Sequence, residues 1–148
     1  MAMAVSDVRP ARDPRQLRLI KAVAILMAVE AVSLAVASGL HLGGSVHGRS
    51  SSFDPDAAGI AEAVIGVVLA VAAVALLRGG IRARTVAIGA NAFALLGFLI
   101  GISETARGGR IPDIAYHATV IPLLVAGLVL LIRARDIPAG VEDEITPS

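Results

Sequence analysis

Four long apolar stretches, each bounded by charged residues or by glycine and proline, constrain this chain more than any other feature. They cover residues 19–42, 57–77, 85–103 and 114–132. A bilayer core of about 30 Å needs roughly 17 to 25 apolar residues per helix, and each stretch has that length. Because lipid cannot satisfy free backbone N–H and C=O groups, each membrane-spanning stretch must be helical. The sequence therefore predicts an all-α fold, a polytopic membrane protein with an antiparallel four-transmembrane-helix bundle.

The composition agrees with a membrane protein and excludes several other classes. Of the 148 residues, 56% are hydrophobic and 17% are charged, and the mean hydropathy is +0.80. A soluble domain is about a quarter charged, and a chain this short has one core in which to bury its apolar residues. The net charge of +1 argues against a nucleic-acid partner, and the absence of cysteine excludes disulfides and thiolate chemistry. The lipid bilayer is therefore the partner that the sequence predicts.

Lysine and arginine are distributed unevenly between the two ends of the apolar stretches. The N-terminal segment, the second connection and the C-terminal flank together hold Arg9, Arg12, Arg15, Arg18, Lys21, Arg78, Arg82, Arg84, Arg133 and Arg135. The first and third connections hold only Arg49, Arg107 and Arg110. Basic residues favour the cytoplasmic side of a membrane. We therefore predict a multi-pass protein of the cell membrane with both termini in the cytoplasm.

The chain divides into one transmembrane domain and two polar tails. Residues 1–18 form a basic cytoplasmic tail, residues 19–135 a single transmembrane domain, and residues 136–148 an acidic cytoplasmic tail. A cleaved signal peptide ending near Ala37 is the competing interpretation of the first stretch. Glu30 argues against it, because the apolar part of a signal peptide is normally uncharged. We therefore expect the first stretch to remain in the chain as a helix.

Small residues are expected to set the contacts between helices, because lipid provides no hydrophobic force between apolar helices. The clearest close-approach motif is Gly97-x-x-x-Gly101 in the third stretch. Such a pair lets two helix backbones approach closely, either within one chain or between chains. A homo-oligomer or a larger membrane complex formed through Gly97 and Gly101 is the protein partner that the sequence suggests.

Five polar side chains interrupt the apolar stretches and are the candidates for a functional site. They are Glu30, His41, Glu62, Asn91 and His117. An ionised side chain at the centre of a bilayer costs about 2.5 to 3.5 kcal/mol on insertion scales, so such residues usually face inward, are paired, and have a function. We therefore predict that these residues bind a ligand or protons inside the bundle.

Helix geometry sorts these side chains into two layers. At about 1.5 Å per residue, Glu62 lies about 9 Å and His117 about 6 Å below the outer ends of their helices, and His41 lies at the outer end of its own helix. Glu30 and Asn91 lie at similar heights, about 13 Å and about 10 Å above the inner ends of the first and third helices. The sequence therefore predicts an outer layer of His41, Glu62 and His117, and a midplane pair of Glu30 and Asn91.

Three interpretations of the outer layer remain open. Glu62 and His117 can form a buried hydrogen-bonded pair that fixes the helix register, or the layer can carry a ligand or a proton path. His41, Glu62 and His117 can also hold a divalent metal, although we expect neither a metal nor another cofactor, because no two histidines have the spacing of ligands on one helix face.

No catalytic motif is recognised in the sequence, and no catalytic residue is assigned. We therefore expect a protein that binds or conducts a small ligand or protons rather than an enzyme. A non-catalytic accessory subunit of a larger membrane complex is the first alternative. A membrane-embedded metalloenzyme is the second.

The chain resembles small four-helix integral membrane proteins of actinobacterial type. The resemblance is carried by Glu62 early in the second stretch and by the Tyr116-His117 pair early in the fourth. Arginine also outnumbers lysine twelve to one, a bias typical of GC-rich bacterial genomes. The resemblance implies a four-helix fold and a bacterial source, and it implies no activity.

Overall fold

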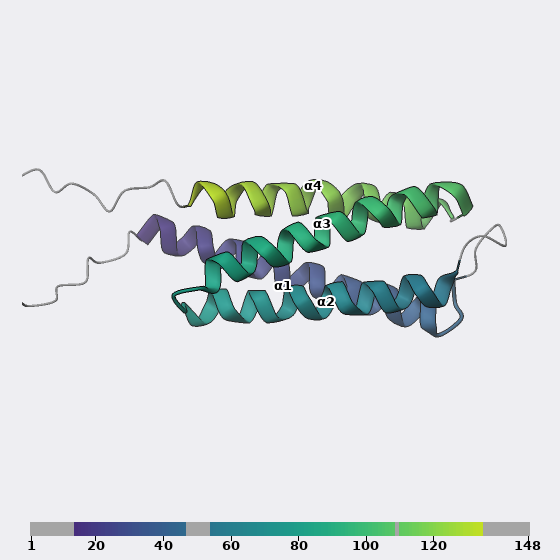
Figure 1. Ribbon diagram of the computed structural model, residues 1–148, viewed down its shortest axis with the longest axis horizontal. Helices are drawn as coiled ribbons and strands as arrows, with labels where there is room; N and C mark the ends of the chain where they lie inside the picture. The colour runs from purple at the N-terminus through teal and green to yellow at the C-terminus, as the bar shows by residue number, and fades with distance from the viewer. Residues whose placement is uncertain (1–13, 47–53, 109, 135–148) are drawn as a thin grey trace, which may run out of the picture.

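The computed structural model describes residues 14–46, 54–108 and 110–134, and within them the chain forms four α-helices and no β-strand. The helices are α1 (Pro14–Leu42), α2 (Pro55–Arg78), α3 (Ala83–Gly108) and α4 (Ile111–Arg133). All four are long and apolar enough to cross a membrane, judged by length and composition. Figure 1 shows them lying lengthwise beside one another. The predicted all-α class and the four apolar helices are therefore confirmed.

The helices are longer than the apolar stretches that predict them. α1 begins at Pro14, so residues 14–18, which the sequence assigns to the basic tail, are helical. Proline is favourable in the first turn of a helix, because the missing N–H has no intrahelical partner there. α3 continues past Ser103 to Gly108. A bilayer length argument finds only the apolar part of each helix, and polar residues continue the helix beyond it. The acidic tail at 136–148 lies outside the described residues.

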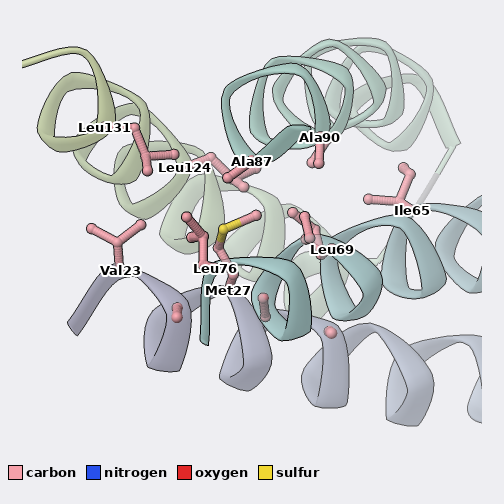
Figure 2. Close-up of a cluster of buried hydrophobic side chains, with 14 of the residues drawn as sticks. Val23, Met27, Ile65, Leu69, Leu76, Ala87, Ala90, Leu124 and Leu131 are labelled. Carbon is pink, nitrogen blue, oxygen red and sulfur yellow. The ribbon is translucent and has the colours of Figure 1, made fainter. Parts of the chain in front are cut away.

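The interior is filled by a few large aliphatic side chains and many alanines. Met27, Leu69 and Leu124 are fully buried, and Figure 2 shows them meeting between the helices. Ala87 and Ala94 of α3 are also fully buried. Because the alanine side chain is a single methyl group, neighbouring helix backbones can approach closely at these positions. Small residues therefore set the distance between these helices.

The outward faces of the helices carry many large apolar side chains. Ile25, Val32, Val67 and Ile100 are each at least 60% exposed. A helix that is hydrophobic on all sides belongs either in the core of a large protein or in a membrane. The exterior of this chain is therefore suited to an apolar environment.

Cross-helix hydrogen bonds join the helices at one end of the molecule. Gln16 Nε2 donates to the carbonyl oxygen of Ala134 over 2.9 Å, which joins the start of α1 to the end of α4. Arg84, at the start of α3, donates from Nε and Nη2 to the carbonyl oxygens of Leu131 and Ile132 over 2.7 and 3.0 Å. These carbonyls lie in the last turn of α4, where a helix needs donors from outside itself. We call this the closed end.

Candidate functional site

A cavity of about 560 Å³ lies opposite the closed end, where α1 and α3 end and α2 and α4 begin. Its walls are mainly apolar and include Leu34, Ile65 and Phe98. The polar residues that line it are His41, Asp54, Glu62, Glu104, Thr105, Asp113 and His117. We call this space the end cavity. The three residues of the predicted outer layer therefore line one space.

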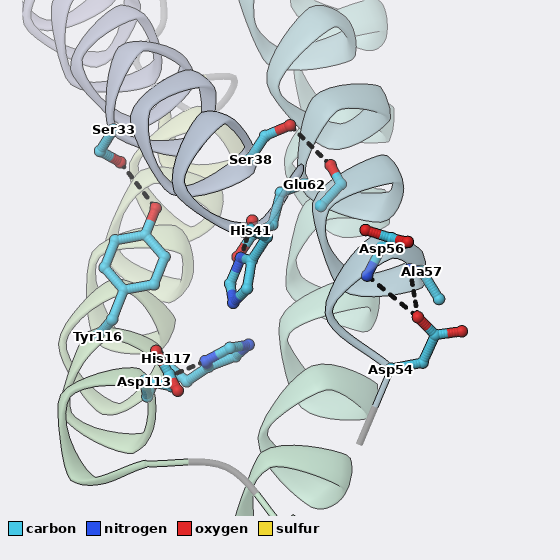
Figure 3. A network of polar contacts seen from close by, with 11 residues as sticks. Ser33, Ser38, His41, Asp54, Asp56, Ala57, Glu62, Asp113, Tyr116 and His117 are labelled. Atoms are coloured by element: carbon cyan, nitrogen blue, oxygen red, sulfur yellow. Dashed lines mark hydrogen bonds and ion pairs between the residues drawn. The ribbon is translucent and has the colours of Figure 1, made fainter. Parts of the chain in front are cut away.

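The best-defined polar contact of the end cavity joins His41 of α1 to Glu62 of α2. His41 Nδ1 lies 2.7 Å from Glu62 Oε2, and the two side chains are 7% and 11% exposed. An imidazole whose Nδ1 carries the hydrogen donates this bond to the carboxylate. Figure 3 shows the His41 ring and the Glu62 side chain meeting between α1 and α2. A buried carboxylate held by an imidazole can attract a cation, orient the ring or accept a proton.

The close approach of α1 and α2 positions this pair. Ser38 Oγ donates to the carbonyl oxygen of Gly59 over 2.8 Å. A Cβ atom at Gly59 would lie 3.1 Å from His41 Cβ and 2.8 Å from Leu42 Cγ, so a larger residue would push the end of α1 away. Glu62 follows Gly59 by three residues, which places both on one face of α2. The glycine therefore lets His41 come within hydrogen-bond reach of Glu62.

His117 lines the same cavity but has a different hydrogen-bond partner. Its Nδ1 lies 2.8 Å from the carbonyl oxygen of Asp113, one turn earlier in α4. Because a carbonyl oxygen only accepts, Nδ1 carries the hydrogen, and Nε2 of the neutral ring is an acceptor. The predicted hydrogen-bonded pair of Glu62 and His117 is therefore wrong. Glu62 bonds to His41, and His117 bonds to the backbone of its own helix.

The two glycines of the close-approach motif face other helices of the same chain. A Cβ atom at Gly97 would lie 2.5 Å from Ile65 Cδ1, and one at Gly101 would lie 2.5 Å from His117 Nε2. Gly101 therefore provides the space that the His117 ring occupies. Both glycines also line the end cavity, so the motif is used within the chain. A homo-oligomer or a membrane complex formed through Gly97 and Gly101 stays a prediction.

Ser33 and Tyr116 form a link between α1 and α4 that sequence reasoning missed. Their hydroxyl oxygens lie 2.9 Å apart, and Ser33 Oγ donates to the carbonyl oxygen of Glu30 over 2.8 Å, as Figure 3 shows for the first contact. Because the Ser33 hydrogen goes to Glu30, Tyr116 donates to Ser33. The ring of Phe98 lies 5.8 Å from the Tyr116 ring and 5.1 Å from the His117 ring. The spacing of Ser33 three residues after Glu30, on one helix face, is the signal that could have found this link.

Glu30 and Asn91, the predicted midplane pair, lie deep in the interior and are 2% and 0% exposed. Neither the Glu30 carboxyl oxygens nor the Asn91 amide atoms have a hydrogen-bond partner among the described residues. Asn91 Nδ2 lies against Gly127 of α4, where a Cβ atom would be 2.9 Å away, and Leu26 of α1 borders the same point. Asn91 is therefore near the height of Leu26, which precedes Glu30 by about one helical turn. Glu30 and Asn91 lie at neighbouring heights, but their side chains do not bond to each other.

A metal centre is not assembled in the described part of the chain. No group of three or more His, Cys, Asp or Glu side chains within residues 14–46, 54–108 and 110–134 has an arrangement that could hold a metal ion. His41, Glu62 and His117 share the end cavity without converging on a common point as ligands. The end cavity instead combines two imidazoles and a buried carboxylate with mainly apolar walls.

Comparisons of the chain with family models, with curated proteins and with solved structures find no match. Any inference about function therefore depends on the residues of the end cavity and on the buried polar groups of the interior.

Proposed function

We propose that this chain is a small-molecule-binding protein of the cell membrane, in which the end cavity holds one small, largely apolar ligand. The observation that carries the proposal is a cavity of about 560 Å³ with the His41–Glu62 pair buried in its lining. Ligand sites in proteins are clefts of about 300 to 1,000 Å³ with mainly apolar walls and a few well-placed polar groups. The end cavity has this size and this lining, and the polar pair would orient the ligand.

We further propose that the helices form an antiparallel bundle across the membrane, with both chain termini in the cytoplasm. The hydrogen bonds from Gln16 and Arg84 support the antiparallel order, because they join the starts of α1 and α3 to the end of α4. The exposed apolar side chains on all four helices support insertion into lipid. In the orientation that the basic residues favour, the end cavity lies toward the outer face of the cell membrane.

Cysteine labelling tests this orientation, and the chain has no cysteine of its own to interfere. Ser45 lies in the connection after α1 and Arg82 in the connection between α2 and α3, and both are exposed. In intact bacterial cells, Ser45→Cys is expected to react with a membrane-impermeant maleimide. Arg82→Cys is expected to react only after the membrane has been opened. The reverse pattern of reaction would contradict the orientation.

A cavity-filling substitution tests the ligand site. Ala61 of α2 lines the end cavity and Ala70 of the same helix does not, and both are exposed. Three probes share a benzyl group and match in their number of non-hydrogen atoms: benzyltrimethylammonium, uncharged neopentylbenzene and phenylmethanesulfonate. We expect at least one of them to bind the purified chain in lipid nanodiscs. Ala61→Leu is expected to weaken that binding by about tenfold, because the added side chain occupies part of the cavity.

Ala70→Leu is the matched control for this experiment and is expected to leave the dissociation constant unchanged. Calorimetric titration of each probe into empty nanodiscs measures its partition into lipid, and this signal is subtracted. If none of the probes binds, or if both leucine variants weaken binding equally, the proposed ligand site is wrong.

A non-catalytic subunit of a larger membrane complex is the second candidate function, and one observation favours it. An open apolar groove of about 410 Å³ runs over α2 and α3 and is lined by Val67, Val71, Gly89 and Phe93. A glycine in such a groove lets another helix approach closely. Native mass spectrometry after purification in a mild detergent separates the two functions. A second chain in fixed ratio favours the subunit, and the chain by itself with a bound small molecule favours the binding protein.

A further inference from the structure

We propose that the ligand of the end cavity is an organic cation, with the Glu62 carboxylate as its counter-charge. This inference rests on the proposed function of the cavity and names the chemical class of the ligand. Three kinds of observation support it: the charges that line the cavity, the hydrogen bonds of its two histidines, and its aromatic rings.

The charged residues that line the end cavity are all acidic. They are Asp54, Glu62, Glu104 and Asp113, and no lysine or arginine of the described residues lines it. Three of these carboxylates have partners outside the cavity: Asp54 caps α2, Asp113 accepts from the backbone N–H of Arg110 at the start of α4, and Glu104 pairs with Arg107. An anionic ligand would bring its charge toward carboxylates with no lysine or arginine among the described lining residues to meet it. A cationic ligand is attracted instead.

Glu62 is the most deeply placed of the four carboxylates, with 8% of its surface exposed. The hydrogen bond from His41 Nδ1 uses one of its two oxygens, Oε2. A neutral imidazole makes this bond without cancelling the negative charge of the carboxylate. Because apolar walls surround the pair, water screens this charge less than it screens the carboxylates of Asp54 and Glu104. We therefore assign the counter-charge to Glu62.

His117 and two phenylalanines favour the same class of ligand. The bond from His117 Nδ1 to the carbonyl oxygen of Asp113 leaves Nε2 of the neutral ring as an acceptor, and this atom lies beside Gly101 in the cavity lining. Phe93 and Phe98 line the cavity as well. The face of an aromatic ring attracts a cation that lies within about 6 Å of its centre. The apolar walls accept a hydrocarbon body, which distinguishes an organic cation from a hydrated metal ion.

The three benzyl probes test this ligand class, because they match in size and differ in charge. Benzyltrimethylammonium is expected to bind the purified chain at least about tenfold more tightly than neopentylbenzene, and phenylmethanesulfonate is expected to bind most weakly. The nanodiscs are made of zwitterionic lipid, so that the bilayer itself does not attract the cation. The measured quantity is the dissociation constant of each probe after subtraction of the signal from empty nanodiscs.

Glu62→Gln removes the charge and keeps an oxygen that can accept the hydrogen bond from His41. In this variant, the preference for the cation over the uncharged probe is expected to fall below about threefold. Binding of neopentylbenzene by the same sample shows that the variant is folded. Asp56→Asn is the matched control, because Asp56 is exposed on the same helix, does not line the cavity, and loses the same charge. The control is expected to keep the full preference.

The possible outcomes distinguish this inference from the proposed function. Equal or tighter binding of the uncharged or anionic probe by the unsubstituted chain overturns the cation and leaves the ligand site standing. Failure of all three probes to bind overturns both. A full cation preference in Glu62→Gln overturns the assignment of the counter-charge. Because the ranking of the probes uses the unsubstituted chain, it decides the ligand class even if Glu62→Gln fails to fold.

Discussion

His41→Leu is expected to lower the free energy of unfolding by about 3 to 5 kcal/mol, because it leaves the Glu62 carboxylate buried without its hydrogen-bond donor. The double variant His41→Leu/Glu62→Leu is expected to recover most of this loss, since an apolar pair replaces the orphaned carboxylate. Thermal unfolding of both single variants and the double variant in one detergent measures the coupling. If the loss in the double variant equals the sum of the two single losses, the side chains do not interact.

His117→Leu is the matched control for this cycle. His117 lines the same cavity as Glu62, and its hydrogen bond goes to Asp113. The effects of His117→Leu and Glu62→Leu on the free energy of unfolding are therefore expected to add within about 0.5 kcal/mol. A strong coupling between His117 and Glu62, together with none between His41 and Glu62, would contradict this assignment and make His117 the partner of the Glu62 carboxylate.

Glu30→Met is expected to raise the free energy of unfolding by about 1 to 3 kcal/mol, whereas most substitutions of buried residues lower it. The Glu30 side chain is buried, and neither of its carboxyl oxygens has a hydrogen-bond partner among the described residues. Methionine has a similar length and no strongly polar group, so the cost of burying the carboxyl group disappears. Thermal unfolding of the purified variant in the same detergent measures the gain.

Glu30→Gln is the control, because it keeps two polar atoms at the same place and is expected to give no comparable gain. A methionine variant less stable than the unsubstituted chain would mean that Glu30 has a bonding partner that outweighs the cost of its burial. If Glu30→Met raises the free energy of unfolding and also weakens binding of the benzyl probes, Glu30 is a group retained for function at the expense of stability.

Features that depend on position along the chain could be predicted from the sequence. The four helices follow from the length of the apolar stretches and from the need to satisfy backbone groups in lipid. The heights of His41, Glu62 and His117 follow from the rise of an α-helix, and all three line the end cavity. Both arguments need only the positions of apolar and polar residues, the thickness of a bilayer core and the rise of an α-helix.

Features that depend on the rotation of each helix about its axis could not be predicted in the same way. Glu62 meets His41 because Gly59 lets the end of α1 approach α2. His117 turns toward Gly101, with its Nδ1 bonded to the backbone of α4. Each outcome depends on which neighbour fills the space beside a glycine. A single sequence shows where the glycines are, but it does not show which helix each of them faces.

The closed end gives the molecule a mechanical asymmetry. Gln16 and Arg84 tie α1 and α3 to the end of α4, whereas beside the cavity the side-chain hydrogen bonds between helices in the described residues all involve α1, and none joins α3 to another helix. Thermal motions that separate α3 from its neighbours are therefore expected to pivot at Arg84 and to have their largest amplitude beside the cavity. A ligand could then enter and leave by a small outward swing of the cavity end of α3, without rearrangement of the alanine-rich core.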